Sequence, residues 1–301
     1  MWIFLSLIGA FTQSLEAAIK KKSLQVGGMN TVIGTLSFLV AGIVFFIIML
    51  ATVKSPWPFQ LSSKFWEAMF WYAGLNLIAS WYGYKALDIA EFSFLAPFIA
   101  ITSLTIVFPP IFILGEFPKV SALIGIAFVV AGSIVMSFRK KSAVFDAEKS
   151  KRDKDNLKGL MYFFVVIICF TFTPTATKVA IQESSPIFTS FLVHILIAMG
   201  FLVMTFAFKK TSNLVSVLVE PPKRKLLLAI LVMGLLTFLE NGSINAAMAM
   251  APVSIVMAIK RIAPLFSFLI GITYFHERAD ILKKLVGSLL MVSGAILIIA
   301  L

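Results

Sequence analysis

The chain has 301 residues, of which 60% are hydrophobic and only 13% are charged. Soluble domains are usually about 45–50% apolar and about 25% charged, so this composition excludes an ordinary soluble domain. The net charge of +12 would suit a nucleic-acid partner, but the basic residues are scattered over loops between apolar runs, so we expect no nucleic-acid partner.

Ten apolar runs follow one another along the chain, and each reaches or approaches the roughly 17–25 residues that a helix needs to cross a bilayer. A spanning segment must satisfy its own backbone hydrogen bonds, and the runs lack the alternation of barrel strands. We therefore predict an all-α membrane protein with ten transmembrane helices, at approximately 1–18, 29–53, 66–84, 91–114, 121–138, 159–180, 187–208, 226–247, 254–275 and 285–301.

The two halves of the chain repeat each other, which predicts residues 1–138 and 159–301 as two five-helix repeats joined by a charged cytoplasmic linker at 139–158. An odd number of spans per repeat inserts the second repeat upside down relative to the first, as in many transporters. The residues that match after a shift of 161 or 162 positions include Ser93 with Ser254, Glu116 with Glu277, Gly125 with Gly287 and Gly132 with Gly294.

The basic residues predict the orientation. Of the 26 Lys and Arg, 20 follow the first, third, fifth, seventh and ninth spans, 4 lie on the opposite side, and Lys260 and Arg261 lie within the ninth span. Because cytoplasmic loops are enriched in Lys and Arg, we expect the linker in the cytoplasm and both termini outside, in the plasma membrane of a bacterium or archaeon.

With two inverted halves in view, the chain resembles the EamA-type branch of the drug/metabolite transporter superfamily. The resemblance implies a carrier with a central cavity and alternating access. Characterised members usually have cytoplasmic termini, so either this chain is flipped, which the charge bias favours, or the span count is wrong by one. The likeness is carried by Ser93-Phe-Leu-Ala-Pro97, Leu114-Gly-Glu-Phe-Pro118, Gly125 and Gly132, and by Ser254-Ile-Val-Met-Ala258, Pro264-Leu-Phe266, His276-Glu-Arg278, Gly287 and Gly294.

Ionisable groups inside predicted spans are candidates for a substrate site, because each costs roughly 2.5–3.5 kcal/mol at the bilayer centre on insertion scales. Lys260 and Arg261 are adjacent cations, and the phosphate translocators of the superfamily are similar in having such a pair in the ninth helix. The alternative interpretation is a structural ion pair with Glu240. The predicted substrate-binding residues, all at a similar depth in the second half, are Lys178, His194, Glu240, Asn241, Asn245, Lys260 and Arg261.

Three cations against one carboxylate predict an anionic substrate. The predicted function is secondary-active transport of a small polar metabolite that bears a carboxylate or phosphate, with a coupling proton or ion as a further partner. The alternatives are an exporter of amino acids or amphipathic drugs and a non-transporting membrane subunit. Since the sequence contains no Gly-x-x-x-x-Gly-Lys-Ser/Thr loop, no metal spacing and a single cysteine, Cys169, we expect no cofactor, no metal and no enzymatic activity.

Overall fold

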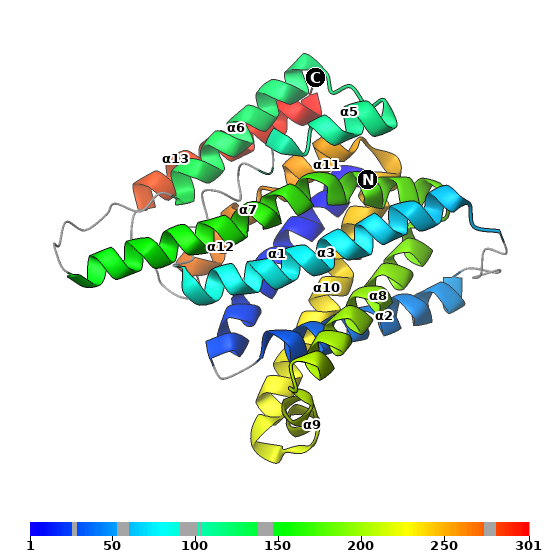
Figure 1. Ribbon diagram of the computed structural model, residues 1–301. Helices are drawn as coiled ribbons and strands as arrows, with labels where there is room; N and C mark the ends of the chain where they lie inside the picture. Colours follow the sequence, from blue (N-terminus) through cyan, green and yellow to red (C-terminus); the bar gives the residue numbers. More distant parts are fainter. Residues whose placement is uncertain are drawn as a thin grey trace. The chain divides into compact units, whose positions relative to one another are not determined.

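A computed structural model of the protein describes residues 1–25, 29–52, 60–90, 102, 104–137, 147–273 and 281–300, and these residues form helices and no strands (Figure 1). The first group of helices is α1 (Trp2–Gln25), α2 (Asn30–Thr52), α3 (Ser63–Ile89), α5 (Phe108–Leu114) and α6 (Val120–Ser137). The second group is α7 (Ala147–Gln182), α8 (Pro186–Ala207), α9 (Thr211–Val219), the 3-10 helix η1 (Pro221–Lys223), α10 (Arg224–Met250), α11 (Val253–Lys260), α12 (Ala263–Thr273) and α13 (Ile281–Ala300).

Six of the helices are long and apolar enough to cross a membrane. Six of the predicted spans are thus supported by helices of suitable length and composition, and the chain is an integral, multi-pass membrane protein. Within the described residues the six are Trp2–Lys20, Asn30–Thr52, Lys154–Gln182, Pro186–Ala207, Arg224–Met250 and Ile281–Ile298.

The other four predicted spans are not among these six helices, for separate reasons. The span at 66–84 lies within α3, whose polar residues lower its hydropathy, and the span at 121–138 corresponds to the shorter apolar helix Val120–Val135. Most of the predicted span at 91–114 lies outside the described residues. The span at 254–275 is two helices, α11 and α12, separated by Arg261 and Ile262.

Pro264 explains why α11 ends where it does. Proline has no N–H, and its ring clashes with the carbonyl four residues earlier, which here belongs to Lys260, the last residue of α11. In the first turn of a helix neither effect matters, and Pro264 is the second residue of α12. The sequence thus breaks the predicted ninth span at the Lys260-Arg261 pair.

Helix α7 begins earlier than the sequence predicts. Its first residue is Ala147, inside the predicted linker 139–158, whereas residues 138–146 lie outside the described residues. The segment from 147 to 158 is rich in Lys and Arg, which are good helix formers, so the polar stretch continues directly into the apolar span as a single helix of 36 residues.

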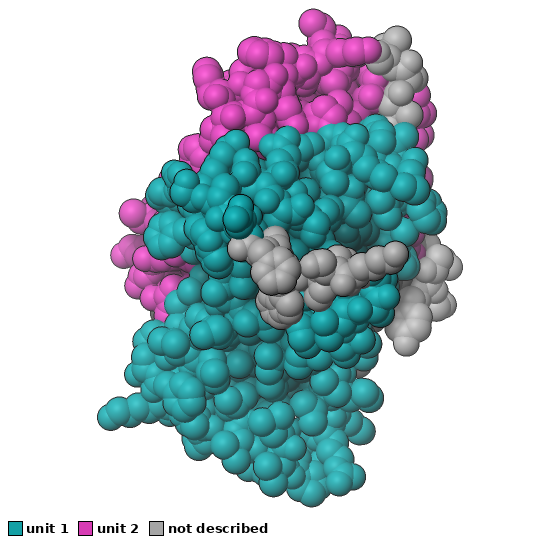
Figure 2. Space-filling model, turned by 90° about the vertical axis from the view of Figure 1, so that its right-hand side faces the viewer, with its two compact units in different colours: residues 1–77, 176–251 teal, residues 78–175, 252–301 magenta. Residues whose placement is uncertain are grey.

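The chain divides into two compact units, coloured separately in Figure 2. Unit 1 contains residues 1–77 and 176–251, and unit 2 contains residues 78–175 and 252–301. Each unit therefore combines segments from both predicted repeats. Helices α3 and α7 each begin in one unit and end in the other.

Unit 1 is built on the helix pairs α1–α10 and α2–α8. Glycines allow the second pair to approach closely, since Gly34 faces the ring of Phe201 and Gly42 faces Ile195. Their order shows that the two helices are antiparallel. Ser62, which precedes α3, donates a 2.7 Å hydrogen bond to Glu183, which follows α7, and Lys64 lies 3.2 Å from the same carboxylate. The hydrogen bond from Ser62 and the interaction with Lys64 lower the pKa of the exposed Glu183 carboxyl.

Unit 2 is organised around the pair α6–α13. Two glycine pairs bring the helix backbones together: Gly125 with Gly294, and Gly132 with Gly287. A Cβ built on Gly132 would lie 2.5 Å from the carbonyl oxygen of Gly287, and one on Gly125 would lie 2.6 Å from that of Gly294. Small residues of this kind let membrane helices pack by van der Waals contact where no hydrophobic effect drives them together.

Replacing Gly132 by Ala should therefore destabilise the protein by roughly 1–3 kcal/mol, the usual cost of overpacking, because the new methyl group meets backbone that must move. Gly74→Ala is the matched control, since a Cβ there meets nothing within 4 Å and Ala is the better helix former. Denaturant or thermal unfolding in detergent measures both. Equal midpoints for the two variants would contradict the close packing at Gly132.

Candidate functional site

A cluster of buried polar side chains lies in unit 1, where α3, α7, α8 and α10 supply its members. Helix α10 contributes Glu240 and Asn245, which are 6% and 1% exposed, and α8 contributes His194, which is 1% exposed. Three residues that the sequence interpretation did not select also belong to it, namely Tyr72 on α3, Thr177 on α7 and Ser190 on α8.

Asn245 connects three of these helices. Its Nδ2 donates to the Ser190 hydroxyl at 2.8 Å and lies 3.5 Å from the Tyr72 hydroxyl. The Tyr72 hydroxyl also hydrogen-bonds the side chain of Thr177. In turn the Ser190 hydroxyl donates to the carbonyl of Pro186 at 2.6 Å, one turn earlier in α8. The buried amide thus fixes α3, α8 and α10 to one another through hydrogen bonds.

His194 is held in one orientation. Its Nδ1 lies 2.6 Å from the carbonyl oxygen of Ser190, and because a carbonyl can only accept, this nitrogen carries the hydrogen. The Nε2 of the neutral ring is then the acceptor. The rings of Phe38 and Phe45 flank the imidazole at centroid distances of 5.7 and 5.1 Å.

Glu240 is the carboxyl group of the cluster, and it lies close enough to the Tyr72 hydroxyl and the His194 ring for a charge on it to act on both. The neighbouring Asn241 is half-buried, and its side chain donates to the carbonyl of Thr237 in its own helix at 3.0 Å. Glu240, His194 and Asn245 therefore form a group that the depth argument from sequence placed together.

Lys178, another residue predicted from the sequence, binds the C-terminal end of α10. Its ammonium donates to the carbonyl of Met248 and, at 2.9 Å, to that of Ala251. The carbonyl of Met248 needs such a donor, because the residue four positions later is Pro252, which has no N–H. A cation at a helix C-terminus also interacts favourably with the helix dipole.

Lys260 and Arg261, the last two predicted residues, belong to unit 2. Lys260 ends α11, and Arg261 follows it with its backbone N–H bonded to the carbonyls of Met257 and Ala258. Both side chains are half-buried. At the other end of α11, Glu116 accepts the N–H of Val253 at 2.8 Å, so the carboxylate caps this helix.

Metal ligation has no candidate here: among the residues described, no group of three or more His, Cys, Asp and Glu side chains could hold a metal ion. The polar cluster of unit 1 is thus made of hydrogen-bonding and ionisable side chains buried between apolar helices.

Comparison with known proteins gives the family. Residues 157–300 match the EamA-like transporter family. This segment contains nearly all of the second predicted repeat, 159–301. No curated protein matches the chain. A solved structure described only as "Crystal structure of protein" covers 98% of this chain and 94% of its own chain, with a TM-score of 0.74 and 16% identity. At that identity the likeness shows the fold alone, and it shows it for nearly the whole chain.

The match of residues 157–300 confirms the resemblance inferred from sequence.

Replacing Lys178 by Met should lower stability by roughly 1–3 kcal/mol, the penalty for leaving buried hydrogen-bonding groups without a partner. The carbonyl of Met248 would lose its donor, while the volume of the side chain would be nearly kept. Lys64→Met is the control. The Lys64 side chain is 62% exposed and pairs with Glu183, and surface ion pairs contribute only about 0–1 kcal/mol. The stability of the two variants is compared by unfolding both in the same detergent. An equal loss of stability at both positions would refute the capping role of Lys178.

Proposed function

We propose that this transporter is a secondary-active carrier that moves a small polar, anionic metabolite by alternating access. The observation that carries the proposal is the buried polar cluster of Tyr72, Ser190, His194, Glu240 and Asn245. Polar and ionisable groups are expensive in a membrane and typically mark substrate or ion pathways. A helix bundle that only had to be stable could fill these positions with apolar side chains.

Within this proposal the predicted residues have separate roles. Asn241, Asn245 and His194 offer hydrogen bonds to polar groups of the substrate. Lys178 holds α10, on which Glu240 and both asparagines lie, and so it positions them. The charge on the substrate is bound by Lys260 and Arg261, since a guanidinium grips a carboxylate or phosphate with two parallel hydrogen bonds and an ammonium adds a point charge.

Two inverted five-helix repeats, and hence ten spans, are part of the same proposal. A shift of 162 positions takes Gly125 to Gly287 and Gly132 to Gly294. The contacts join Gly125 to Gly294 and Gly132 to Gly287, so exchanging the repeats returns the same two contacts. This is the behaviour of a two-fold axis, and because α6 and α13 are antiparallel, the axis would be perpendicular to them and lie in the membrane plane.

The remaining helix pairs support the same symmetry. Under the repeat, α1 corresponds to α7 and α10 corresponds to α3. In unit 1, α1 packs on α10. In unit 2, Gly159 of α7 lies against Ala86 and Ala90 at the end of α3, a contact that the symmetry requires of the equivalent helices.

Transport and coupling can be tested together in proteoliposomes. Carboxylates, phosphate esters and amino acids are first screened by thermal shift, because a ligand of the native state raises apparent stability. Any ligand found is then followed across the membrane under a pH gradient. If Glu240 takes up the coupling proton, Glu240→Gln should keep binding, slow net transport at least about tenfold and flatten its pH dependence.

Outcomes of that experiment separate the parts of the proposal. Normal transport by Glu240→Gln with unchanged pH dependence would leave Glu240 a structural residue. Unimpaired binding of an anion by Arg261→Lys would remove Arg261 as its partner, because the planar fork has been replaced by a point charge. If amino acids bind and simple anions do not, the amino-acid exporter considered from sequence replaces the anion carrier.

For the orientation we propose that both termini are outside, as the distribution of Lys and Arg favours. Ser63 and Ser212 are both exposed and fall on opposite predicted sides. In a Cys169→Ser background, an impermeant maleimide added to intact cells should label Ser63→Cys and spare Ser212→Cys until the cells are permeabilised. The reverse pattern would establish cytoplasmic termini.

A further inference from the structure

Helix α9 is an amphipathic helix that no membrane-spanning role explains. It has nine residues, Thr211–Val219, and at about 1.5 Å per residue it is about 14 Å long, well short of the roughly 30 Å of a bilayer core. It connects α8 to α10, both of which are candidate spans. In Figure 1, α9 is seen nearly end-on, whereas α8 and α10 are seen from the side. Its axis is therefore steeply inclined to theirs.

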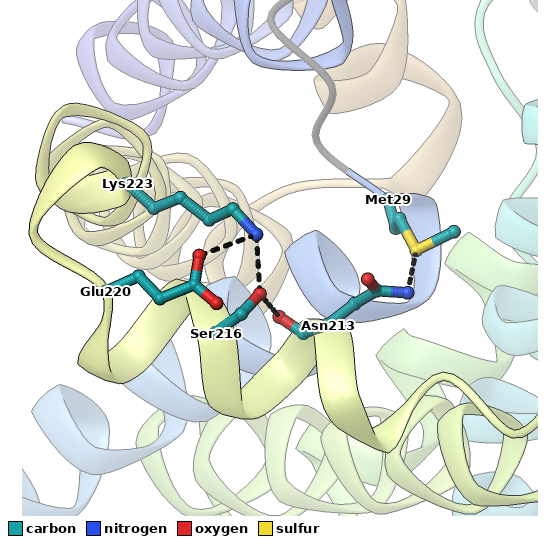
Figure 3. A network of polar contacts seen from close by, with 5 residues as sticks. All are labelled: Met29, Asn213, Ser216, Glu220 and Lys223. Atoms are coloured by element: carbon teal, nitrogen blue, oxygen red, sulfur yellow. Dashed lines mark hydrogen bonds and ion pairs between the residues drawn. The ribbon is translucent and has the colours of Figure 1, made fainter.

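One side of α9 packs on the rest of unit 1. Leu214 and Val217 pack on the core cluster that contains Val32, Ile33 and Ile230. Polar contacts add to this packing (Figure 3): Asn213 donates to the sulfur of Met29 at 2.8 Å, and Lys223 donates to the Ser216 hydroxyl at 2.6 Å. The helix is thus held at the end of the bundle.

The next face of α9 is apolar and exposed. Val215, Leu218 and Val219 are 53%, 51% and 73% exposed, and their i, i+3, i+4 spacing puts them on a single stripe. The polar residues Ser212, Asn213 and Ser216 occupy the next arc around the helix, centred about 110° from the stripe. Exposing such an apolar stripe to water is unfavourable, so we expect apolar material from outside the protein to cover it.

The charges around α9 identify that occupant. Five basic residues stand at its two ends, against one carboxylate, Glu220, which is paired with Lys223 at 3.2 Å. Lys209, Arg224 and Lys225 are exposed. A short helix with an apolar stripe flanked by Lys and Arg is the pattern of segments that lie in the interface of a membrane with anionic lipids. The five basic residues are Lys209, Lys210, Lys223, Arg224 and Lys225.

We propose that α9 lies in the bilayer interface, with Val215, Leu218 and Val219 in the acyl region and the flanking basic residues on the headgroups of anionic phospholipids. The site is a lipid contact of the folded carrier and does not depend on what the carrier transports. Each basic residue near an anionic surface contributes to attraction within about one Debye length, while the apolar stripe sets the depth of the helix.

The depth of α9 is tested on the full-length protein in nanodiscs that contain phosphatidylcholine and phosphatidylglycerol. In a Cys169→Ser background, an environment-sensitive fluorophore is attached to Leu218→Cys or to Ser212→Cys. Lipids spin-labelled near the headgroup should quench the probe at 218 at least about twofold more than the probe at 212, and aqueous iodide should show the opposite preference. Equal access of iodide to both positions would place the stripe in water and overturn the proposal.

A second arm tests the headgroups by their effect on melting temperature. Phosphatidylglycerol should raise the melting temperature of the wild type relative to phosphatidylcholine alone. The double variant Lys209→Gln, Lys225→Gln should lose at least about half of that rise. The control variant Lys154→Gln, Lys158→Gln removes the same charge from exposed positions of α7. It should keep the full rise in melting temperature. An equal loss in both variants, or a full rise with inorganic phosphate in phosphatidylcholine discs, would refute an anionic-lipid site at α9.

Discussion

A bilayer core contains no water, so every backbone and side-chain polar group inside it must find its partner within the protein. The helices satisfy their own backbones, and several buried hydroxyls follow the same rule. Those of Ser6, Thr12, Ser14 and Thr35, for example, donate to carbonyls four residues earlier in their own helices. Where a helix is interrupted, a side chain supplies the hydrogen-bond partner that the backbone lacks. Lys178 serves the carbonyl that Pro252 leaves without an N–H, and Glu116 accepts the N–H that begins α11.

The polar cluster of unit 1 follows the same rule with a different outcome. Its hydroxyl and amide groups bind one another across helices, so hydrogen bonds between α3, α8 and α10 offset the cost of burying these polar groups. His194 is oriented by a backbone carbonyl at its Nδ1. Under the proposed function, a substrate that binds here exchanges its own hydration for contacts with these groups. The affinity of such a site depends on how well the fixed geometry replaces water, which is the basis for specificity toward polar solutes.

Sequence reasoning predicted the helical class, the family and six supported spans, because apolar runs of bilayer length have few alternative explanations. It also grouped His194, Glu240 and Asn245 by depth. It could not find Tyr72 or Ser190, since uncharged polar residues are common in membrane helices and only a tertiary contact distinguishes them. The target of Lys178 was equally hidden, because it depends on the position of α10 relative to α7. The early start of α7 was missed because charge and polarity were taken as signs of a loop, although Lys and Arg also favour helix.

The division into units has a mechanical consequence. The chain passes from one unit to the other at three places, between residues 77 and 78, 175 and 176, and 251 and 252. The first two lie inside the continuous helices α3 and α7, and the second follows Pro174 by a single residue, at a point where the helix lacks one backbone hydrogen bond. The third lies in the non-helical turn at Ala251, whose carbonyl is bound by Lys178. Two continuous helices and one turn bound by Lys178 thus carry the chain from unit to unit, and in α7 the missing hydrogen bond at Pro174 makes the crossing point the easiest place for that helix to bend.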